Sequence, residues 1–415
     1  MNPLDENYDV IIAGGGPAGS SAAIHLAQRG LRVLLAEQKR FPRAKLCGEF
    51  ISPECFDHFR KLGVADEMLS CNPATLTETV FYSRKGNRIS VPSGWFATRS
   101  ALGLSRAEMD NNLLRRAAKV GADVLEGATV TDVIDVDGRI TGVRIRTDDD
   151  ERVYHSKLAI DATGRPRILS RKIHGDAGEK KSPDRARLVA FKAHFANTGV
   201  APGACEIYSY PRGYGGLSTI ENGMSNLCFI VASRDVRRFH SDPELVLRST
   251  VMTNHRAAQV LASANRMSEW LSVSLDRFGL HDPTPKPGLI AIGDSASFID
   301  PFTGSGMLMA LENGELAAKL ILDREDLFRT LSDNEWPARK QLIDFADTYS
   351  RQYRNAFGPR LQTCRWLRRT AYNPRLADLV ILLCSASERF RNRIARATRS
   401  GEHRAFVASD NDSMA

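Results

Sequence analysis

The sequence lacks the long apolar run that a membrane span needs and the paired cysteines that a zinc site needs. Its 415 residues include no apolar stretch of 18 or more, so we expect no membrane-spanning helix. The first ten residues lack the basic and apolar regions of a secretory signal, and we expect none. The seven cysteines form no Cys-x-x-Cys pair, which argues against a disulfide framework and favours a reducing cytoplasm.

Two other kinds of catalytic site are also missing. The nine histidines show no His-Glu-x-x-His or other metal-ligand spacing, so we expect no metal centre. No Gly-x-Ser-x-Gly turn follows an apolar strand, which argues against a hydrolase with its serine on such a turn. The composition is that of an ordinary enzyme, 42% hydrophobic and 26% charged, and the chain is long enough for more than one domain.

The net charge of +8 is concentrated near the C-terminus. Residues 351–399 include twelve Arg, no Lys, one Asp and one Glu, so this segment is strongly basic and the rest is slightly acidic. One interpretation is a solvated helical face. The alternative is a surface for anionic lipid, which would give peripheral membrane contact, or for an acidic carrier protein. No aromatic-interleaved motif that reads nucleic acid accompanies these charges, so we expect no nucleic-acid partner.

A glycine-rich turn lies near the N-terminus, between an apolar strand predicted over residues 8–13 and a helix predicted over residues 20–28. Its glycines fit G-x-G-x-x-G. The first allows a tight turn, the second lets a pyrophosphate approach the backbone, and the third lets helix and strand pack closely. The start of the helix adds free N–H groups and partial positive charge. The predicted cofactor contacts here are Gly14, Gly16, Pro17, Ala18 and Gly19.

A second strand, predicted over residues 31–37, ends in Glu37. An acidic side chain at this place accepts hydrogen bonds from both hydroxyls of a ribose and repels a 2′-phosphate. The succession of strand, glycine turn, helix, strand and acidic end predicts a dinucleotide, FAD or NAD, on a Rossmann-like α/β domain.

A later glycine-containing loop favours FAD over NAD as the cofactor. A strand predicted over residues 289–292 leads to Asp294, whose carboxylate can accept a hydrogen bond from a ribityl hydroxyl. Small residues then bring backbone N–H groups to the start of a helix, whose positive end would face the N1–C2=O edge of a flavin. NAD has no use for this second anion site. The predicted contacts here are Asp294, Pro301, Gly304, Gly306 and Met307.

These motifs resemble those of the large FAD-dependent group that includes p-hydroxybenzoate-hydroxylase-like monooxygenases and geranylgeranyl reductases. The resemblance covers roughly residues 5–330 and rests on GGGPAG and on the GD-x6-P-x2-G-x-G element. Two further segments carry it. FPRAKLCGEFISPECFDHFRKLGV (41–64) resembles the basic-x-Cys-Gly segment of geranylgeranyl reductases, and LSRAEMDNNLLRRA (104–117) resembles the group's Arg-bearing helix over FAD. The resemblance implies a glutathione-reductase-type FAD-binding domain and an antiparallel β-sheet substrate domain.

The same resemblance implies site residues. Arg43, Lys45 and Arg106 are expected to contact FAD or the active site, where cations offset the cofactor's charge. Cys47 is expected close to the flavin, on the substrate cavity, as a cofactor contact and a catalytic residue; a small buried packing residue is the alternative. Glu49 is expected to be either a proton donor or an acid that caps a helix.

The chain is predicted to have three parts: a discontinuous FAD-binding domain (1–80, 100–180 and 282–340), a substrate-binding domain (81–99 and 185–280) and a basic C-terminal helical region (341–415). In the first, Val130 is expected beside the adenine. In the second, β-rich runs separated by Gly and Pro predict an antiparallel sheet above the flavin. In the third, a break is expected at Pro374, and the apolar residues 375–390 are expected to dock on the protein, with a bilayer as the alternative.

Three flavin reactions compete: monooxygenation, alkene reduction and halogenation. Geranylgeranyl reductases carry P-x-x-Y-x-W-x-F-P in the substrate sheet; here Pro211 and Tyr214 are present, but Gly216 replaces the Trp and leaves room for a wider substrate. Halogenases of the group carry Trp-x-Trp-x-Ile-Pro, which the four Trp here do not form. Tyr214 is expected to line the pocket or orient a polar group, as a catalytic residue; a core tyrosine is the alternative.

We therefore predict a cytoplasmic FAD-dependent oxidoreductase, a monooxygenase (hydroxylase) acting on a bulky apolar or aromatic small molecule. Alkene reduction of an isoprenoid is the alternative, ahead of halogenation and of non-catalytic flavin binding. No separate nicotinamide-binding motif is visible in the sequence. NAD(P)H is the expected reductant, in transient contact with the flavin, and a partner flavin reductase is the alternative source of electrons.

Overall fold

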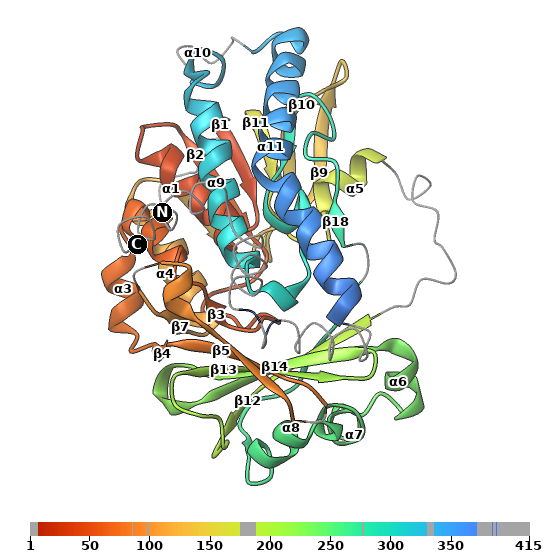
Figure 1. Cartoon of the computed structure of the whole chain (residues 1–415). Coiled ribbons are helices and arrows are strands. Elements are labelled where there is room, and N and C mark those ends of the chain that lie inside the picture. Colours follow the sequence, from red (N-terminus) through yellow and green to blue (C-terminus); the bar gives the residue numbers. More distant parts are fainter. Residues whose placement is uncertain are drawn as a thin grey trace.

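The structure is a computed structural model of the chain. It describes residues 7–84, 86–97, 99–174, 188–275, 278–329 and 336–371, together with residues 384 and 387. Two large sheets dominate it, one at each end of the molecule, and long helices pack against the first (Figure 1).

The first sheet has the strand order β8-β2-β1-β11-β10-β9, with β19 also paired to β11. Its core strands are parallel, and β9 and β10 add an antiparallel extension. The carboxyl ends of three parallel strands meet, because Ala13, Asp161 and Ala291 are aligned. Ligands of open α/β sheets bind at such an edge. The strands are β1 (Asn7–Ala13), β2 (Val33–Glu37), β8 (Asp123–Glu126), β9 (Thr129–Val136), β10 (Arg139–Arg146), β11 (Glu151–Asp161) and β19 (Leu289–Ala291).

Helices α1 (Pro17–Ala27) and α9 (Gly306–Leu322) pack closely against each other beside this sheet. Gly314 permits the approach, since a Cβ there would lie 2.5 Å from the carbonyl oxygen of Ala18. Helix α1 begins three residues before its predicted start, because Pro17 fits the first turn of a helix, where no backbone donor is needed. The glycine turn therefore passes directly into the helix.

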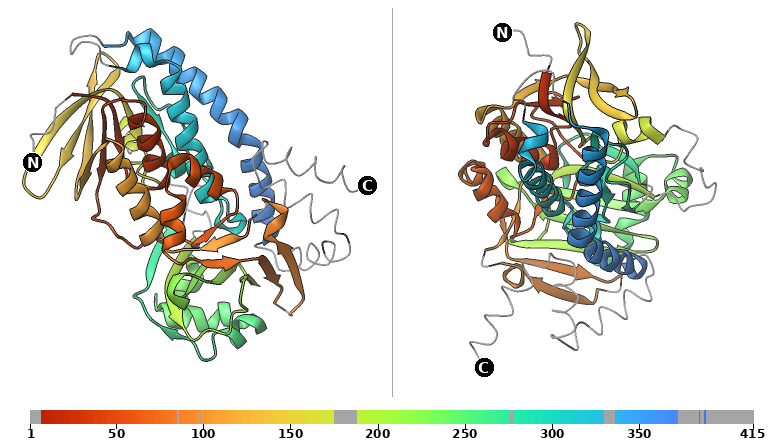
Figure 2. Two further views of the ribbon diagram at one scale, coloured as in Figure 1. Left: turned by 90° about the vertical axis from the view of Figure 1, so that its left-hand side faces the viewer. Right: turned by 90° about the horizontal axis from the view of Figure 1, so that it is seen from above.

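The long helix α11 (Arg339–Ala371) runs beside α9 across the molecule (Figure 2). The hydroxyl of Tyr349 donates to the carbonyl oxygen of Ala291 (2.9 Å), which ties this helix to the end of β19. Pro374 and most of the apolar segment 375–390 lie outside the described residues. Of the helices within the described ranges, none combines the length and apolar character that crossing a bilayer requires.

The second sheet has the strand order β16-β12-β15-β14-β13-β5-β6, with β17 also paired to β12. The β-rich runs predicted an antiparallel sheet, and among the described strands the departure is the parallel pairing of β13 with β5. The first three residues of β5, 78–80, lie before the predicted boundary between residues 80 and 81. The strands are β5 (Glu78–Tyr82), β6 (Arg88–Pro92), β12 (Leu188–Ala196), β13 (Ala204–Tyr210), β14 (Gly213–Thr219), β15 (Ser225–Ala232), β16 (Asn265–Arg266) and β17 (Leu271–Leu275).

Helices α6 (Ser233–Arg238), α7 (Pro243–Ser249) and α8 (His255–Val260) lie on the outer side of the second sheet (Figure 1). They share an apolar core with alternate residues of its strands, such as Phe191, Ala193 and Phe195 of β12. Because side chains alternate along a strand, the other residues of these strands face the first sheet. That inner face borders the site described below.

Shorter elements join the two sheets. Strands β3, β7 and β4 form a small sheet that meets the end of β14: a Cβ on Gly103 would lie 1.9 Å from the carbonyl oxygen of Thr219. The remaining elements are β3 (Phe50–Ile51), β4 (Ala74–Leu76), β7 (Ala101–Gly103), β18 (Gly279–Leu280), β20 (Ser297–Phe298), α2 (Cys55–Leu62), α3 (Ala65–Ser70), α4 (Arg106–Lys119), α5 (Ile168–His174) and α10 (Glu325–Phe328).

Candidate active site

The glycine turn, residues 14–19, lies at the carboxyl end of β1. Gly14 has a φ of +110°, and a Cβ there would lie 2.4 Å from the carbonyl oxygen of Ala162. A Cβ on Gly19 would lie 2.0 Å from the carbonyl oxygen of Gly14. Gly16 differs, because a Cβ there would meet nothing within 4 Å and the residue lines a cavity. Gly14 and Gly19 thus shape the turn, while Gly16 leaves its open side free for a ligand.

Glu37 ends β2 beneath this turn. One carboxylate oxygen accepts a hydrogen bond from the Gly15 amide (2.8 Å) and the other from the Lys39 amide (2.9 Å). The carboxylate therefore fastens the turn to the end of β2. Its predicted hydrogen bonds to a ribose stay a prediction.

The second loop, residues 293–306, joins β19 to α9 beside the start of α1, where a Cβ on Gly293 would lie 2.8 Å from the Cβ of Ala18. The Gly293 amide donates to the side-chain oxygen of Asn313 (2.7 Å), and Gly304 has a φ of +61°. Because α9 begins at Gly306, its free amides lie at the cavity. Burial raises the pKa of Asp294, against the lowering effect of Lys45. The five predicted contacts of this loop all line the cavity: Asp294, Pro301, Gly304, Gly306 and Met307.

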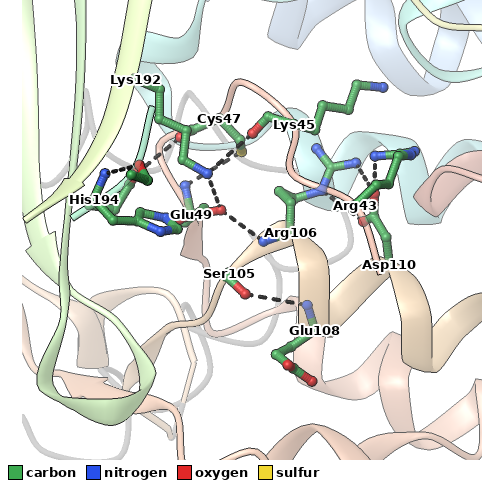
Figure 3. A network of polar contacts seen from close by, with 12 residues as sticks. Arg43, Lys45, Cys47, Glu49, Ser105, Arg106, Glu108, Asp110, Lys192 and His194 are labelled. Atoms are coloured by element: carbon green, nitrogen blue, oxygen red, sulfur yellow. Dashed lines mark hydrogen bonds and ion pairs between the residues drawn. The ribbon is translucent and has the colours of Figure 1, made fainter. Parts of the chain in front are cut away.

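Two of the three cations of the resemblance, Arg106 and Arg43, meet at Asp110, and Lys45 lies near enough to feel their charges (Figure 3). Arg106 donates two hydrogen bonds to this carboxylate (2.7 and 2.6 Å), and a guanidinium nitrogen of Arg43 lies 3.2 Å from it. Burial, together with the charges of Arg106 and Arg43, lowers the pKa of Lys45 to about 8. A pyrophosphate beside this cluster would offset the excess positive charge.

The residues present fit FAD. The glycine turn is bare on its cavity side, a second helix starts at the same cavity, and Lys45 and Arg106 of the cation cluster line it. Pro17 and Ala18 also line the cavity. Val130 lies in β9, buried in the core shared by β9, β10 and β11, and not among the cavity-lining residues. Its predicted contact with the adenine stays a prediction.

One cavity of about 370 Å³ connects the two loops with the inner face of the second sheet. Apolar and aromatic side chains dominate its wall away from the loops. The ring of Phe302 packs against those of Phe81 (5.6 Å between centroids) and Tyr214 (5.1 Å). Arg165, and Leu367 of α11, also line the cavity, and neither was predicted as a site residue. The cavity suits a bulky, largely apolar molecule.

Tyr214 links the second sheet to the second loop. Its hydroxyl donates to Asp300 (2.6 Å), which also accepts from the Phe302 amide (3.0 Å). The other carboxylate oxygen of Asp300 lies 3.3 Å from Arg368 of α11. Tyr214 lines the cavity and its donor is engaged, which favours a lining or orienting part. A catalytic part stays a prediction.

Cys47 is half-buried and lines the cavity. Its sulfur accepts a hydrogen bond from the Glu49 amide (3.4 Å), and the Arg106 side chain lies within hydrogen-bonding reach of it. The thiol thus lies between the cation cluster and the second sheet. The resemblance placed Cys47 on the substrate cavity close to the flavin; its closeness to the flavin and its catalytic role stay predictions.

Glu49 is fully buried, with a φ of +53°. One oxygen accepts from the Arg106 amide (2.9 Å) and pairs with Lys192, and the other lies 2.7 Å from the ring nitrogen of His194 (Figure 3). Burial raises the pKa of Glu49, but the hydrogen bond with His194 and the charge of Lys192 outweigh it, so this pKa lies below the ordinary value. An ionised acid at the first amide of α4 favours the helix-capping alternative over proton donation.

Lys192 and His194 were not predicted. They stand two residues apart in the apolar run LVAFKAHF, so that both point to the same face of β12. Two polar residues on one face of an otherwise apolar strand are the signal that could have found them.

Comparisons with known proteins agree with this geometry. A family model described as FAD binding domain matches residues 7–324. A 1H-pyrrole-2-carbonyl-(peptidyl-carrier protein) brominase of Pseudoalteromonas luteoviolacea is 26% identical and covers 80% of each chain. A digeranylgeranylglycerophospholipid reductase of Thermoplasma volcanium is 29% identical, covering 76% of this chain and 78% of its own. The structure of a myxobacterial chondrochloren halogenase superposes with a TM-score of 0.69 at 25% identity, covering 85% of this chain and 81% of its own.

The family match spans well over half of the chain and includes both glycine-containing loops. It confirms the resemblance inferred from the motifs, and the superposition confirms the fold class, a Rossmann-like α/β domain with a second sheet and C-terminal helices. The chain therefore belongs to the FAD binding domain family, as a member of its FAD-dependent oxidoreductases.

Proposed function

We propose that the chain uses FAD to reduce carbon–carbon double bonds in a bulky, largely apolar molecule. The observation that carries this proposal is the place of Cys47, whose thiol borders the cavity between the flavin-side loops and the apolar inner face of the second sheet. A thiol there can give a proton to a substrate carbon, which an apolar wall cannot. This reverses the order in which the sequence ranked the two reactions.

The aromatic walls of the cavity support this change of order. The sequence ranked alkene reduction second because Gly216 stands where geranylgeranyl reductases have Trp. Gly216 does face the cavity, but Phe81 of β5 and Phe302 of the second loop place aromatic rings on it from other elements. An isoprenoid slot can thus be aromatic without a Trp in β14. Similarity to a digeranylgeranylglycerophospholipid reductase supports the same conclusion.

The parts played by the chain follow from the geometry. FAD, once reduced, supplies a hydride to one alkene carbon. The glycine turn and the amides at the start of α9 hold the cofactor, and Arg43, Lys45 and Arg106 offset its charge. The apolar wall keeps water away from the reacting bond. The Cys47 thiol donates the proton that the other alkene carbon needs, and a proton from water restores it.

Monooxygenation, the first choice from the sequence, is the second candidate. Its support is the largely apolar cavity next to the flavin side, because hydroxylation with reduced flavin and O2 needs a site from which water is excluded. This reaction requires no proton from Cys47 to a substrate carbon. For both reactions NAD(P)H is the proposed reductant, and a partner flavin reductase is the alternative.

Anaerobic turnover separates the candidates. Holoenzyme is photoreduced without O2 and mixed with geranylgeraniol, and the flavin absorbance and product mass are followed. Flavin reoxidation with a gain of two hydrogens in the product supports alkene reduction. Reoxidation only after isotopically labelled O2 is admitted, with one labelled oxygen atom in the product, supports monooxygenation. A brominated product formed in the presence of bromide would contradict both candidate reactions.

Variants of Cys47 test its part in alkene reduction. Cys47→Ala should slow alkene reduction by about a hundredfold, the usual size of a general-acid contribution, while flavin content stays that of the wild type. Cys47→Ser, which keeps a donor of similar size, should be less impaired. Unchanged turnover in Cys47→Ala would show that this residue serves only in packing.

A further inference from the structure

We propose that Lys192 is a positioning residue, which holds the Cys47 segment (residues 45–49) so that its thiol faces the flavin side of the cavity. This rests on the proposed function only in taking Cys47 as the reacting thiol. Lys192 is not among the residues that line the cavity; it acts through the backbone carbonyl of Lys45 and the carboxylate of Glu49.

The inner face of the second sheet supplies the polar groups. Lys192 and His194 are alternate residues of β12, and in the antiparallel register Asn226 of β15 stands directly opposite His194. Lys192 is 2% exposed and Asn226 1%. Nearby on this face, Ala190 and Ile230 are apolar, while Cys228 stands opposite Lys192 and Ser218 opposite Asn226. These polar residues therefore form a local cluster on a mainly apolar surface.

This cluster contacts every second residue of the Cys47 segment. Lys192 donates to the carbonyl oxygen of Lys45 (3.3 Å) and pairs with the carboxylate of Glu49 (Figure 3). The side-chain amide of Asn226 donates to the carbonyl oxygen of Cys47 (3.1 Å). The thiol is thus fixed from both sides, because Lys45 and Glu49, two residues before and two after Cys47, both contact the ammonium group of Lys192.

The other side of the segment is held by the start of α4. The Arg106 amide donates to the Glu49 carboxylate (2.9 Å), and the Leu104 amide donates to the Glu49 carbonyl oxygen (3.2 Å). Glu49 therefore joins the second sheet to α4, the helix that carries Arg106 and Asp110 of the cation cluster. Any movement of this carboxylate would shift the thiol relative to Arg106.

Two features indicate that the contacts serve position rather than stability alone. Glu49 has a left-handed backbone, which is unfavourable for a residue with a Cβ, so the segment keeps this shape only through its contacts. A buried ion pair is also a poor source of stability, because removing both charges from water offsets most of their attraction. Apolar packing between sheet and segment would stabilise equally well, but it would not define where the thiol points.

The reactivity of the Cys47 thiol tests this proposal without any substrate. Holoenzyme is treated with iodoacetamide, and the alkylation rate of Cys47 is measured by mass spectrometry of its peptide. Lys192→Met keeps the length of the side chain and removes its charge and donors. We expect the Cys47 alkylation rate to rise about tenfold as the released segment exposes its thiol, with a visible shift of the flavin absorption band. Lys192→Arg should restore much of the wild-type rate.

Lys157 offers a matched control. It is a buried lysine of β11 that donates to the carbonyl oxygen of Arg329 (3.2 Å), outside the cavity. Lys157→Met should lower stability without changing the alkylation rate of Cys47 or the flavin band. Equal alkylation rates in Lys192→Met, Lys157→Met and the wild type would overturn the proposal.

A second variant covers the case in which Lys192→Met does not fold. Asn226→Ala removes the hydrogen bond to the Cys47 carbonyl without changing the charge, and the same rise in alkylation is expected; an unchanged rate would overturn the proposal. The alkylation rate of Cys47 is measured without substrate, so it does not depend on whether the protein reduces an alkene. If the wild type reduces no alkene but Cys47 reactivity depends on Lys192, the proposed function fails and the positioning inference stands.

Discussion

The lowered pKa of Lys45 predicts that FAD affinity depends on pH. Burial and the charges of Arg106 and Arg43 lower this pKa from 10.5 to about 8 in the cofactor-free protein. A pyrophosphate placed beside the ammonium would raise it again. FAD binding is then linked to proton uptake, and affinity falls as pH rises above 8, where the free protein loses the Lys45 charge and the complex keeps it.

The magnitude follows from the two pKa values. If the complex restores the ordinary 10.5, affinity at pH 9 should be about tenfold weaker than at pH 7. The pH dependence of folding stability has the opposite sign to that of FAD affinity. A lysine whose folded pKa is lowered binds fewer protons in the folded state than in the unfolded state, so the Lys45 contribution makes the cofactor-free protein more stable as pH rises from 8 to 10.5.

The assay is FAD binding to the apoprotein, followed by quenching of flavin fluorescence at pH 7, 8 and 9 and constant ionic strength. Lys45→Met should bind FAD more weakly at pH 7 and with little change up to pH 9. The reasoning would be refuted by a wild-type affinity that is flat over this range, or by the same slope in Lys45→Met.

Three further predictions test the cofactor loops and the link between the sheets. Gly16→Ala should keep its melting temperature and lose FAD affinity, because the added Cβ meets only the cavity side, whereas Gly19→Ala should lower the melting temperature, because its Cβ would lie 2.0 Å from a carbonyl oxygen; the reverse pattern would mean that the turn is misplaced. Asp294→Ala should weaken FAD about tenfold or more, the size of a hydrogen bond to a charged group, and full flavin retention on gel filtration would contradict this. Tyr214→Phe leaves the buried Asp300 without one donor, which should cost about 1–3 kcal/mol in denaturant unfolding; no change in the midpoint would argue that water replaces the hydroxyl.

The parts of the site that depend on local backbone chemistry could be predicted from the sequence. The glycine turn after β1 and the loop before α9 were placed correctly, because glycines, strand ends and helix starts are neighbours in the chain. Pro17 illustrates the limit of such reasoning: a helix start was predicted from the Ala-rich stretch, and the proline extended it backwards.

What could not be predicted depends on contacts between distant residues. Lys192 meets Glu49 across 143 positions and His194 meets it across 145, and no local pattern specifies such a pairing. The role of Glu49 was left open for the same reason, since its partners decide whether it is ionised. The parallel pairing of β13 with β5 likewise depends on where a distant strand comes to lie.

The distance in sequence between the two halves of the cofactor cradle has a consequence for biosynthesis. The ribosome releases the glycine turn early, but α9 begins only at Gly306, and the residues that grip the Cys47 segment lie in β12 and β15. A nascent chain that ends before Gly306 therefore has only the first half of the cradle. We expect firm cofactor capture only after β19 has joined β11 in the first sheet.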